Sequence, residues 1–279
     1  MWGLGRTGEA KSSFLASHPG GMKTGTVHSV FANSMNIELG GCLVHIGPLD
    51  APLSSFGLVI ARSRLRELLA NCTVDTRVVY KPGRLLFYGE KRLLSLDLDP
   101  LPQVDLRVYP VPMDGKAIRE SMLLRLLSGI HFPALIGIPW EERTQKYARA
   151  LAGKAECGNR EILGYFTGRG LGLTPGGDDL LFGYTFARKL LGQEEDWVTD
   201  WERTDWSKTT KISHAYANAL AKGYAGEDWI ALAALMQSSG KDDAIRIISR
   251  IQSFGHTSGN DALFGFYLGL LNLSQISRR

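Results

Sequence analysis

The stretch GRGLGLTPGGDDLLFGY, residues 168–184, decides the architecture around which the rest of the chain is organised. The glycines and Pro175 ahead of Asp178 disfavour a regular element, because glycine is costly to order and proline lacks an N–H. Asp178 and Asp179 then open an apolar run, which is typical of a helix start. The sequence therefore predicts a glycine-rich loop leading into a helix from about Asp178 to Leu191.

A second stretch near the C-terminus repeats this design. Residues 177–184, GDDLLFGY, align with residues 259–266, GNDALFGF, at an offset of 259 − 177 = 82 residues. Hydroxyl-bearing residues precede both, Thr174 in the first case and Thr257 and Ser258 in the second. Each stretch is a loop that leads into a helix, and the two are called the first and the second joint below. Their similarity predicts a single site built from both. The plainer alternative is two similar helix hairpins packed back to back, with aspartates as caps and glycines as helix contacts.

Length, charge and cysteine content narrow the class of protein. The 279 residues suffice for one large domain or two smaller ones. The net charge of +4 comes from 32 basic and 28 acidic residues without a Lys/Arg block, which disfavours a nucleic-acid partner. No run reaches transmembrane length, and residues 1–22 lack a signal-peptide core, so no membrane partner is expected. Cys42, Cys72 and Cys157 have no metal spacing and favour reduced thiols in a cytoplasmic protein.

The first part of the chain carries strand signals. From about Gly25 to Met113, short alternating or β-branched runs recur between turn residues, and Lys81-Pro82-Gly83 favours a hairpin. One helix is expected at about Ser63 to Leu69. After Asp114, apolar residues recur at helical spacing through to about Leu273. We therefore predict an α+β protein: a loose leader at 1–22, a small antiparallel β-sheet or barrel domain at 23–113, and an all-helical domain at 114–279 that carries both joints.

The joints suggest anion binding. The first turn of a helix offers unpaired N–H groups and the positive end of the helix dipole, and glycines let a ligand approach the backbone. The hypothesis is that amides of Gly176, Gly177 and Gly259 hold a phosphate or carboxylate. The neighbouring aspartates oppose this, since like charges repel by about 1 kcal/mol per close pair. Either the carboxylates cap the helices or a basic group mediates, and Arg169 is the nearest in sequence.

His256 lies in a glycine-flanked loop beside two hydroxyls, so an acid, base or orienting role and a structural role are both open. His28 and His45 alternate within strands and are interpreted as surface residues. The predicted catalytic residues are His256, Asp179 and Asp261, and the predicted substrate-binding residues are Arg169, Thr174, Gly176, Gly177, Asp178, Thr257, Ser258 and Gly259. No zinc spacing, Walker loop or nucleophile elbow is present, so no cofactor is predicted, while a divalent metal at the aspartates stays open.

The two joints resemble the AllH family, named after a subunit of oxamate carbamoyltransferase from anaerobic allantoin degradation. The first loop of that family reads Gly-Leu-Thr-Pro-Ser-Gly-Asp-Asp, so Gly176 stands in place of a serine. The second, His-(Ser/Thr)-Ser-Gly-x-Asp, is matched by residues 256–261. Ser29-Val30-Phe31 and Asn36-Ile37 also look like the N-terminal pattern of the family.

The resemblance implies a subunit of a carbamoyl-transferring complex that needs other subunits as partners. Its reaction would convert oxalurate and phosphate into oxamate and carbamoyl phosphate. The loss of the serine hydroxyl at Gly176 bears on how much of that activity carries over. Two alternatives stay open: a non-catalytic interaction subunit, and a metal-dependent hydrolase that uses the aspartates.

Overall fold

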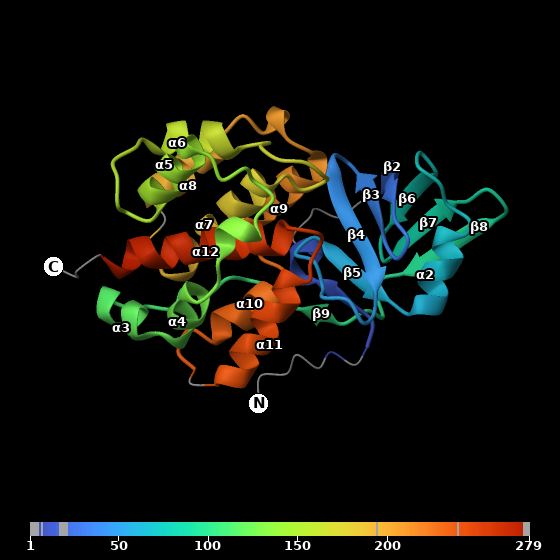
Figure 1. The fold of residues 1–279 in the computed structure, drawn as a ribbon. Coiled ribbons are helices and arrows are strands. Elements are labelled where there is room, and N and C mark those ends of the chain that lie inside the picture. Colours follow the sequence, from blue (N-terminus) through green and yellow to red (C-terminus); the bar gives the residue numbers. More distant parts are fainter. Residues whose placement is uncertain (1–5, 7, 17–21, 194, 239, 276–279) are drawn as a thin grey trace. The chain divides into compact units, whose positions relative to one another are not determined.

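The structure is a computed structural model that describes residues 6, 8–16, 22–193, 195–238 and 240–275 (Figure 1). Within this part the chain forms two compact units. The first contains the described residues up to Arg107 together with Tyr224–Glu227, and the second contains Val108–Gly223 and the chain from Asp228 onward. The fold class is α+β, as predicted.

The first unit is built on one sheet. Within the described residues its strands are β1 (Ala10–Ser12), β2 (Lys23–Val30), β3 (Met35–Leu39), β4 (Cys42–Pro48), β5 (Gly57–Ile60), β6 (Arg77–Lys81), β7 (Arg84–Tyr88), β8 (Leu93–Asp97) and β9 (Gln103–Val104). Their order is β8-β7-β6-β2-β3-β4-β5-β1-β9. Alternate residues of the central strands, such as Ile37 and Ile46, are fully buried on one face, where Leu65 and Leu68 of α2 (Arg62–Leu69) join the same core.

Two features of this sheet correct the prediction. The sheet is mixed instead of antiparallel, because β4 pairs with β5 and β1 with β9 in parallel. Residues 10–16, inside the stretch predicted as a loose leader, form β1 and α1 (Ser13–Ala16), and Ala10 is fully buried. The predicted leader otherwise falls largely on residues 1–5, 7 and 17–21, which lie outside the described residues.

A short return of the chain completes the first unit. The Ala225 N–H donates to the Leu106 carbonyl over 3.1 Å. Oε2 of Glu227 accepts the Leu53 N–H at 2.9 Å and pairs with Arg6 at 3.3 Å. Residues 224–227 are thus bound to the sheet unit although they lie well inside the stretch predicted as helical.

The second unit is helical. Its α-helices are α3 (Gly115–Glu120), α4 (Met122–Ser128), α5 (Glu142–Leu151), α6 (Asn159–Phe166), α7 (Gly176–Leu190), α8 (Glu195–Glu202), α9 (Lys211–Ala221), α10 (Glu227–Ala234, entering from the return segment), α11 (Lys241–Gln252) and α12 (Ser258–Ser274). Two 3₁₀ turns, η1 (Phe132–Ala134) and η2 (Trp206–Lys208), separate some of them. The segment after Asp114 forms two helices, α3 and α4, because Ser121 is extended and caps α4.

Helices α7 and α12 form the centre of this unit and lie beside each other in Figure 1. Both are buried on nearly all sides, with α3, α4, α5 and α11 against α12, and α6 and α9 against α7. A helix that is buried all round is apolar all round, which explains the runs LLFGY and ALFGF. The two repeated stretches are therefore partners in one core.

The contact between α7 and α12 is reciprocal. A Cβ at Gly183 would lie 1.8 Å from the carbonyl oxygen of Ala262, and a Cβ at Gly265 would lie 1.8 Å from that of Leu180. The offset of 82 residues maps Gly183 onto Gly265 and Leu180 onto Ala262. Glycine at both positions lets each helix backbone touch the other, so the sequence repeat is a pseudo-symmetric helix pair.

No helix among the described residues is long and apolar enough to cross a membrane.

Candidate functional site

The helix predicted from about Asp178 begins two residues earlier in the structure. Helix α7 starts at Gly176 after Pro175, and α12 starts at Ser258 after Thr257. Neither Pro175 nor Thr257 makes a side-chain capping bond to its helix. The aspartates lie inside the first turns instead of at the caps, so the hypothesis that the carboxylates cap these helices is wrong.

The two loops meet at their hydroxyls. Thr174 Oγ1 and Ser258 Oγ are 2.9 Å apart although they are 84 residues apart in sequence. Both hydroxyls are hydrogen-bond partners of the Asp179 carboxyl group. A carboxylate of the first joint is thus held by a hydroxyl of each joint.

Asp261 is the counterpart of Asp179 in the second joint and is fully buried. Its oxygens accept the Gly137 N–H at 3.0 and 3.2 Å, and the Thr257 hydroxyl also donates to it. A Cβ at Gly176 would lie 2.9 Å from Asp261 Oδ2. The pseudo-symmetry is visible here too, because Asp179 faces the first residue of α12 and Asp261 faces the first residue of α7.

Burial makes both carboxylates hard to ionise. The pKa of Asp179 is raised well above its ordinary value, chiefly by burial and further by the nearby Asp261 charge, against the lowering effect of the two hydroxyl bonds. Its Oδ2 is buried and has no hydrogen-bond partner among the described residues. Burial also raises the pKa of Asp261 to about 6. The raised pKa of Asp179 favours its acid form, whereas Asp261, with a pKa of about 6, is largely ionised at neutral pH.

Asp178 has hydrogen-bond partners different from those of Asp179 and Asp261. Its Oδ1 accepts the Gly168 N–H at 2.7 Å, and its Oδ2 accepts from the hydroxyl of Thr209. Burial raises the pKa of Asp178. Its bonds tie the start of α7 to its own loop and to the segment before α9, which is a structural role.

The backbone N–H groups of Gly177 and Gly259 already donate hydrogen bonds within the protein. The Gly177 N–H donates to the Arg169 carbonyl at 2.8 Å, and the Gly259 N–H donates to the Phe254 carbonyl at 3.1 Å. A Cβ at either glycine would lie 2.0 Å or less from a carbonyl oxygen of the preceding helix. This corrects the hypothesis that these two amides hold an anion: the glycines are there for close packing.

Two other predicted residues point elsewhere. The guanidinium of Arg169 stacks 3.9 Å from the Tyr165 ring centroid and pairs with Glu141 at 3.4 Å. The side chain of His256 is exposed, and no hydrogen bond joins it to Asp179 or Asp261 within the described part of the chain. The structure therefore gathers Thr174, Gly176, Asp179, Thr257, Ser258 and Asp261, but brings neither Arg169 nor His256 into their hydrogen-bond network.

Sequence reasoning missed Gly137, which follows η1 and holds Asp261 from 124 residues away. A Cβ at Gly137 would lie 2.3 Å from Thr257 Oγ1. Its position in an ordinary loop carries no local pattern that links it to the second joint. Only the tertiary fold reveals it.

The first unit contains a row of hydrogen-bonded polar side chains that the sequence analysis also missed. Ser29, Asn36 and His45 are successive cross-strand partners on β2, β3 and β4. The Asn36 amide donates to Ser29 Oγ at 2.9 Å, so its oxygen, 2.9 Å from His45 Nδ1, accepts the ring N–H. Burial lowers the pKa of His45 to about 4, so the ring is neutral with Nε2 as an acceptor. This corrects the interpretation of His45 as a simple surface residue.

Within the described residues, no group of three or more His, Cys, Asp or Glu side chains is placed to hold a metal ion. The two site aspartates and their hydroxyl partners form a hydrogen-bonded cluster. Such an arrangement suits ligands that exchange hydrogen bonds with carboxyl groups and hydroxyls.

Comparison with known proteins gives one match. The family model described as oxamate carbamoyltransferase subunit AllH matches residues 166–270. A search of curated proteins finds no match. A search of solved structures finds none either. The matched segment starts at the end of α6 and extends into α12, so it contains both loops. Over residues 166–270 this chain is therefore a match to the AllH family, as its two loops predicted.

Proposed function

We propose that this chain is a subunit of a carbamoyltransferase complex and that its two joints bind a small anionic substrate of that complex. The match to the AllH family model supports a carbamoyltransferase-related subunit. The reaction proposed for the complex is oxalurate and phosphate to oxamate and carbamoyl phosphate, in the breakdown of allantoin. Other carbamoyltransferase subunits are the proposed partners.

One observation carries the substrate site. The half-buried hydroxyls of Thr174 and Ser258 come from different loops and converge on Asp179, whose Oδ2 lacks a partner within the described residues. Hydroxyls can donate to a carboxylate or carbonyl oxygen of the substrate. Because the raised pKa of Asp179 favours its neutral form, this carboxyl group donates a hydrogen bond instead of repelling the anion.

The first amide of each helix adds a second kind of donor. Gly176 and Ser258 are the first residues of α7 and α12, and an N–H at this position has no acceptor within its own helix. These amides, in place of those of Gly177 and Gly259, are the proposed backbone contacts to the substrate oxygens. A Cβ at Gly176 would lie 2.9 Å from Asp261 Oδ2, so glycine keeps a side chain out of the space between this amide and Asp261.

The two carboxyl groups suit different steps of carbamoyl transfer. When a phosphate oxygen bonds to the ureido carbon of oxalurate, the C–N bond breaks and the oxamate nitrogen must gain a proton. Asp179 in its acid form can supply that proton. Asp261, with a pKa of about 6, is mostly ionised at neutral pH and can accept an N–H of the substrate. The roles proposed from sequence for these two residues are kept, and that of His256 is not.

Calorimetric titration of the purified full chain tests the substrate site. We expect oxamate to bind to the unmodified chain, and Asp179→Asn to weaken that binding at least tenfold, because the acid donor is lost. Asp242→Asn is the matched control, since Asp242 lies exposed in the first turn of α11 and should leave the affinity unchanged. If the chain binds neither oxamate, phosphate nor carbamoyl phosphate, the proposed site is wrong and a non-catalytic interaction subunit is favoured.

A further inference from the structure

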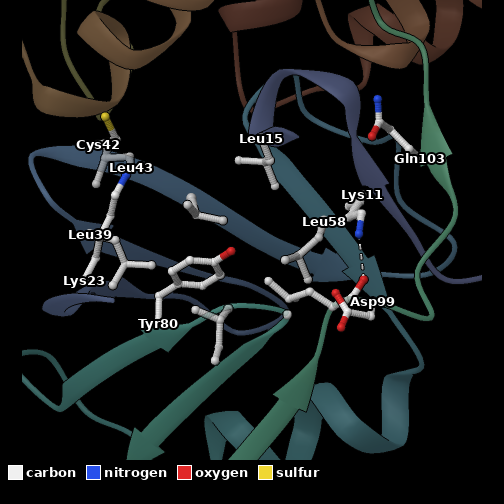
Figure 2. A pocket seen from close by; sticks show the side chains of 14 residues that line it. Lys11, Leu15, Lys23, Leu39, Cys42, Leu43, Leu58, Tyr80, Asp99 and Gln103 are labelled. Carbon is white, nitrogen blue, oxygen red and sulfur yellow. Dashed lines mark hydrogen bonds between the residues drawn. The ribbon is translucent and has the colours of Figure 1, made fainter. Parts of the chain in front are cut away.

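The first unit contains a cavity of about 200 Å³ that is separate from the joints (Figure 2). Its walls come from both halves of the sheet, because the strands curl around it: Leu39, Val44 and Leu58 lie on β3, β4 and β5, and Tyr80 and Leu85 lie on β6 and β7. The mouth of a curled sheet or barrel is a common place for a small-molecule site. All lining residues belong to the first unit, so the cavity is complete within it.

Most of the lining is apolar. The hydrophobic walls are made by Leu15, Leu39, Leu43, Val44, Leu58, Leu85 and Leu98. A few polar groups interrupt them, and Figure 2 shows the Tyr80 ring in the middle of the site with its hydroxyl directed inward. An apolar wall with a few placed polar groups is the usual composition of a ligand pocket, in which the polar groups fix the orientation.

The lining of the cavity contains more positively than negatively charged side chains. Lys11, Lys23 and Asp99 are the charged residues of the lining, and Figure 2 shows Lys11 and Asp99 on one side of the site and Lys23 on the other. Lys11 Nζ donates one hydrogen bond to the Leu98 carbonyl at 2.8 Å, which leaves two of its N–H groups for a ligand. The Asp99 carboxylate lies over Gly83, where a Cβ would be 2.2 Å from it. The excess of positive charge favours an anionic ligand.

The volume limits the size of the apolar part. An engineered protein cavity of about 150 Å³ accepts benzene, a six-carbon ring. A cavity of about 200 Å³ therefore has room for a chain or ring of about six to eight carbons. Larger amphiphiles would extend into solvent.

We propose that this cavity binds a small monocarboxylate with an apolar body of about six to eight carbons. The body lies among the leucines, and the carboxylate accepts hydrogen bonds from Lys11 Nζ and the Tyr80 hydroxyl. Lys23 adds a positive charge that favours a carboxylate ligand. Its aliphatic stem packs along Gly40, where a Cβ would lie 3.3 Å from Lys23 Cδ. The inference does not rest on the function proposed for the helical unit.

Titration of the purified full chain with three six-carbon probes tests the proposal. Hexanoate is expected to bind, hexanol to bind at least tenfold more weakly because it lacks the charge, and hexylamine to show no binding. Equal affinity for hexylamine and hexanoate would overturn the proposal, as would the absence of hexanoate binding at millimolar concentration. Asp179→Asn should leave the hexanoate affinity unchanged, so a failure here is distinct from a failure of the oxamate site.

Variants then locate the bound probe. Lys11→Met is expected to weaken hexanoate about tenfold and hexanol hardly at all, whereas Lys91→Met, at an exposed lysine outside the cavity, should change neither. Val44→Phe fills the cavity from a half-buried wall position and should abolish hexanoate binding. Leu15→Phe is the second filling variant, and circular dichroism verifies that each variant is folded. Unchanged hexanoate affinity in both folded filling variants would contradict the assignment.

Discussion

Gly183→Ala is expected to destabilise the protein by about 2–3 kcal/mol, although alanine ordinarily favours a helix over glycine. The added Cβ would lie 1.8 Å from the Ala262 carbonyl oxygen, so α7 and α12 would have to separate. A backbone carbonyl cannot move aside as a flexible side chain can. The measurement is the free energy of unfolding from urea denaturation, followed by circular dichroism.

Gly164→Ala is the matched control for this change. Gly164 also lies within a helix, α6, but a Cβ there would meet nothing within 4 Å. The same substitution should therefore stabilise the protein, by up to about 1 kcal/mol. If Gly183→Ala were as favourable as Gly164→Ala, the close approach of the two helices would be contradicted.

Because Gly183 and Gly265 are related by the pseudo-symmetry, a double variant tests whether their two contacts are coupled. Gly265→Ala should cost about as much as Gly183→Ala, because its Cβ would also lie 1.8 Å from a carbonyl oxygen of the other helix. Both substitutions open the same interface, so the double variant should lose less stability than the sum of the single losses, by more than about 0.5 kcal/mol. Strict additivity would indicate two independent contacts.

Asp261→Asn is expected to stabilise the protein at pH 7.5 while it removes oxamate binding. Burial raises the pKa of Asp261 from an ordinary 3.8 to about 6. Because the folded pKa is the higher one, the contribution of this group to stability is greatest below about pH 4 and is lost as pH rises to about 6. The shift corresponds to about 3 kcal/mol, and asparagine avoids the burial of charge while its oxygen still accepts the Gly137 N–H.

Urea denaturation at pH 4, 5, 6 and 7.5 measures this effect. At pH 7.5 the Asp261→Asn variant should exceed the unmodified chain by about 1–3 kcal/mol, and its stability should fall less between pH 4 and 6. The remaining fall comes from Asp178 and Asp179, whose pKa values are raised as well. A loss of more than about 1 kcal/mol in the variant at pH 7.5 would show that the ionised carboxylate stabilises the fold.

The sequence predicted the parts of the structure that local patterns encode. Pro82 and Gly83 indicated the Arg77–Tyr88 hairpin, in which Gly83 has a φ of 77°, and apolar spacing indicated the helical region after Asp114, which includes α11 and α12. The repeat also led to the prediction that two distant stretches would share a site. The hairpin and the helices rest on residues close together in the chain, and the repeat rests on the comparison of two short stretches.

Contacts between distant residues were not predictable in this way. The parallel pairing of β4 with β5 and the return of residues 224–227 to the sheet depend on the whole fold. The start of α7 was placed two residues late because Gly176 and Gly177 look like loop residues. In the structure they are helical, and Gly177 is required because a Cβ there would lie 2.0 Å from the Phe166 carbonyl oxygen.

Gly176 stands where the resembled loop has a serine, and its surroundings differ from those of the equivalent residue in the second joint. Ser258, the equivalent residue of the second joint, gives its hydroxyl to Asp179, while Asp261 meets a bare Gly176. Asp261 is instead held by Thr257 and by the N–H of Gly137. The two halves of the site are therefore chemically unequal, which suits a substrate whose two ends differ.

The most direct test of a single site built from both joints is calorimetric titration with oxamate of two variants, Thr174→Val and Thr257→Val. Thr174 is a hydrogen-bond partner of Asp179 and Thr257 of Asp261, so each variant removes one hydroxyl from one loop. We predict one oxamate per chain and a loss of affinity of about fivefold or more in each variant. Binding that is weakened by a change in one loop and untouched by the change in the other would contradict the shared site.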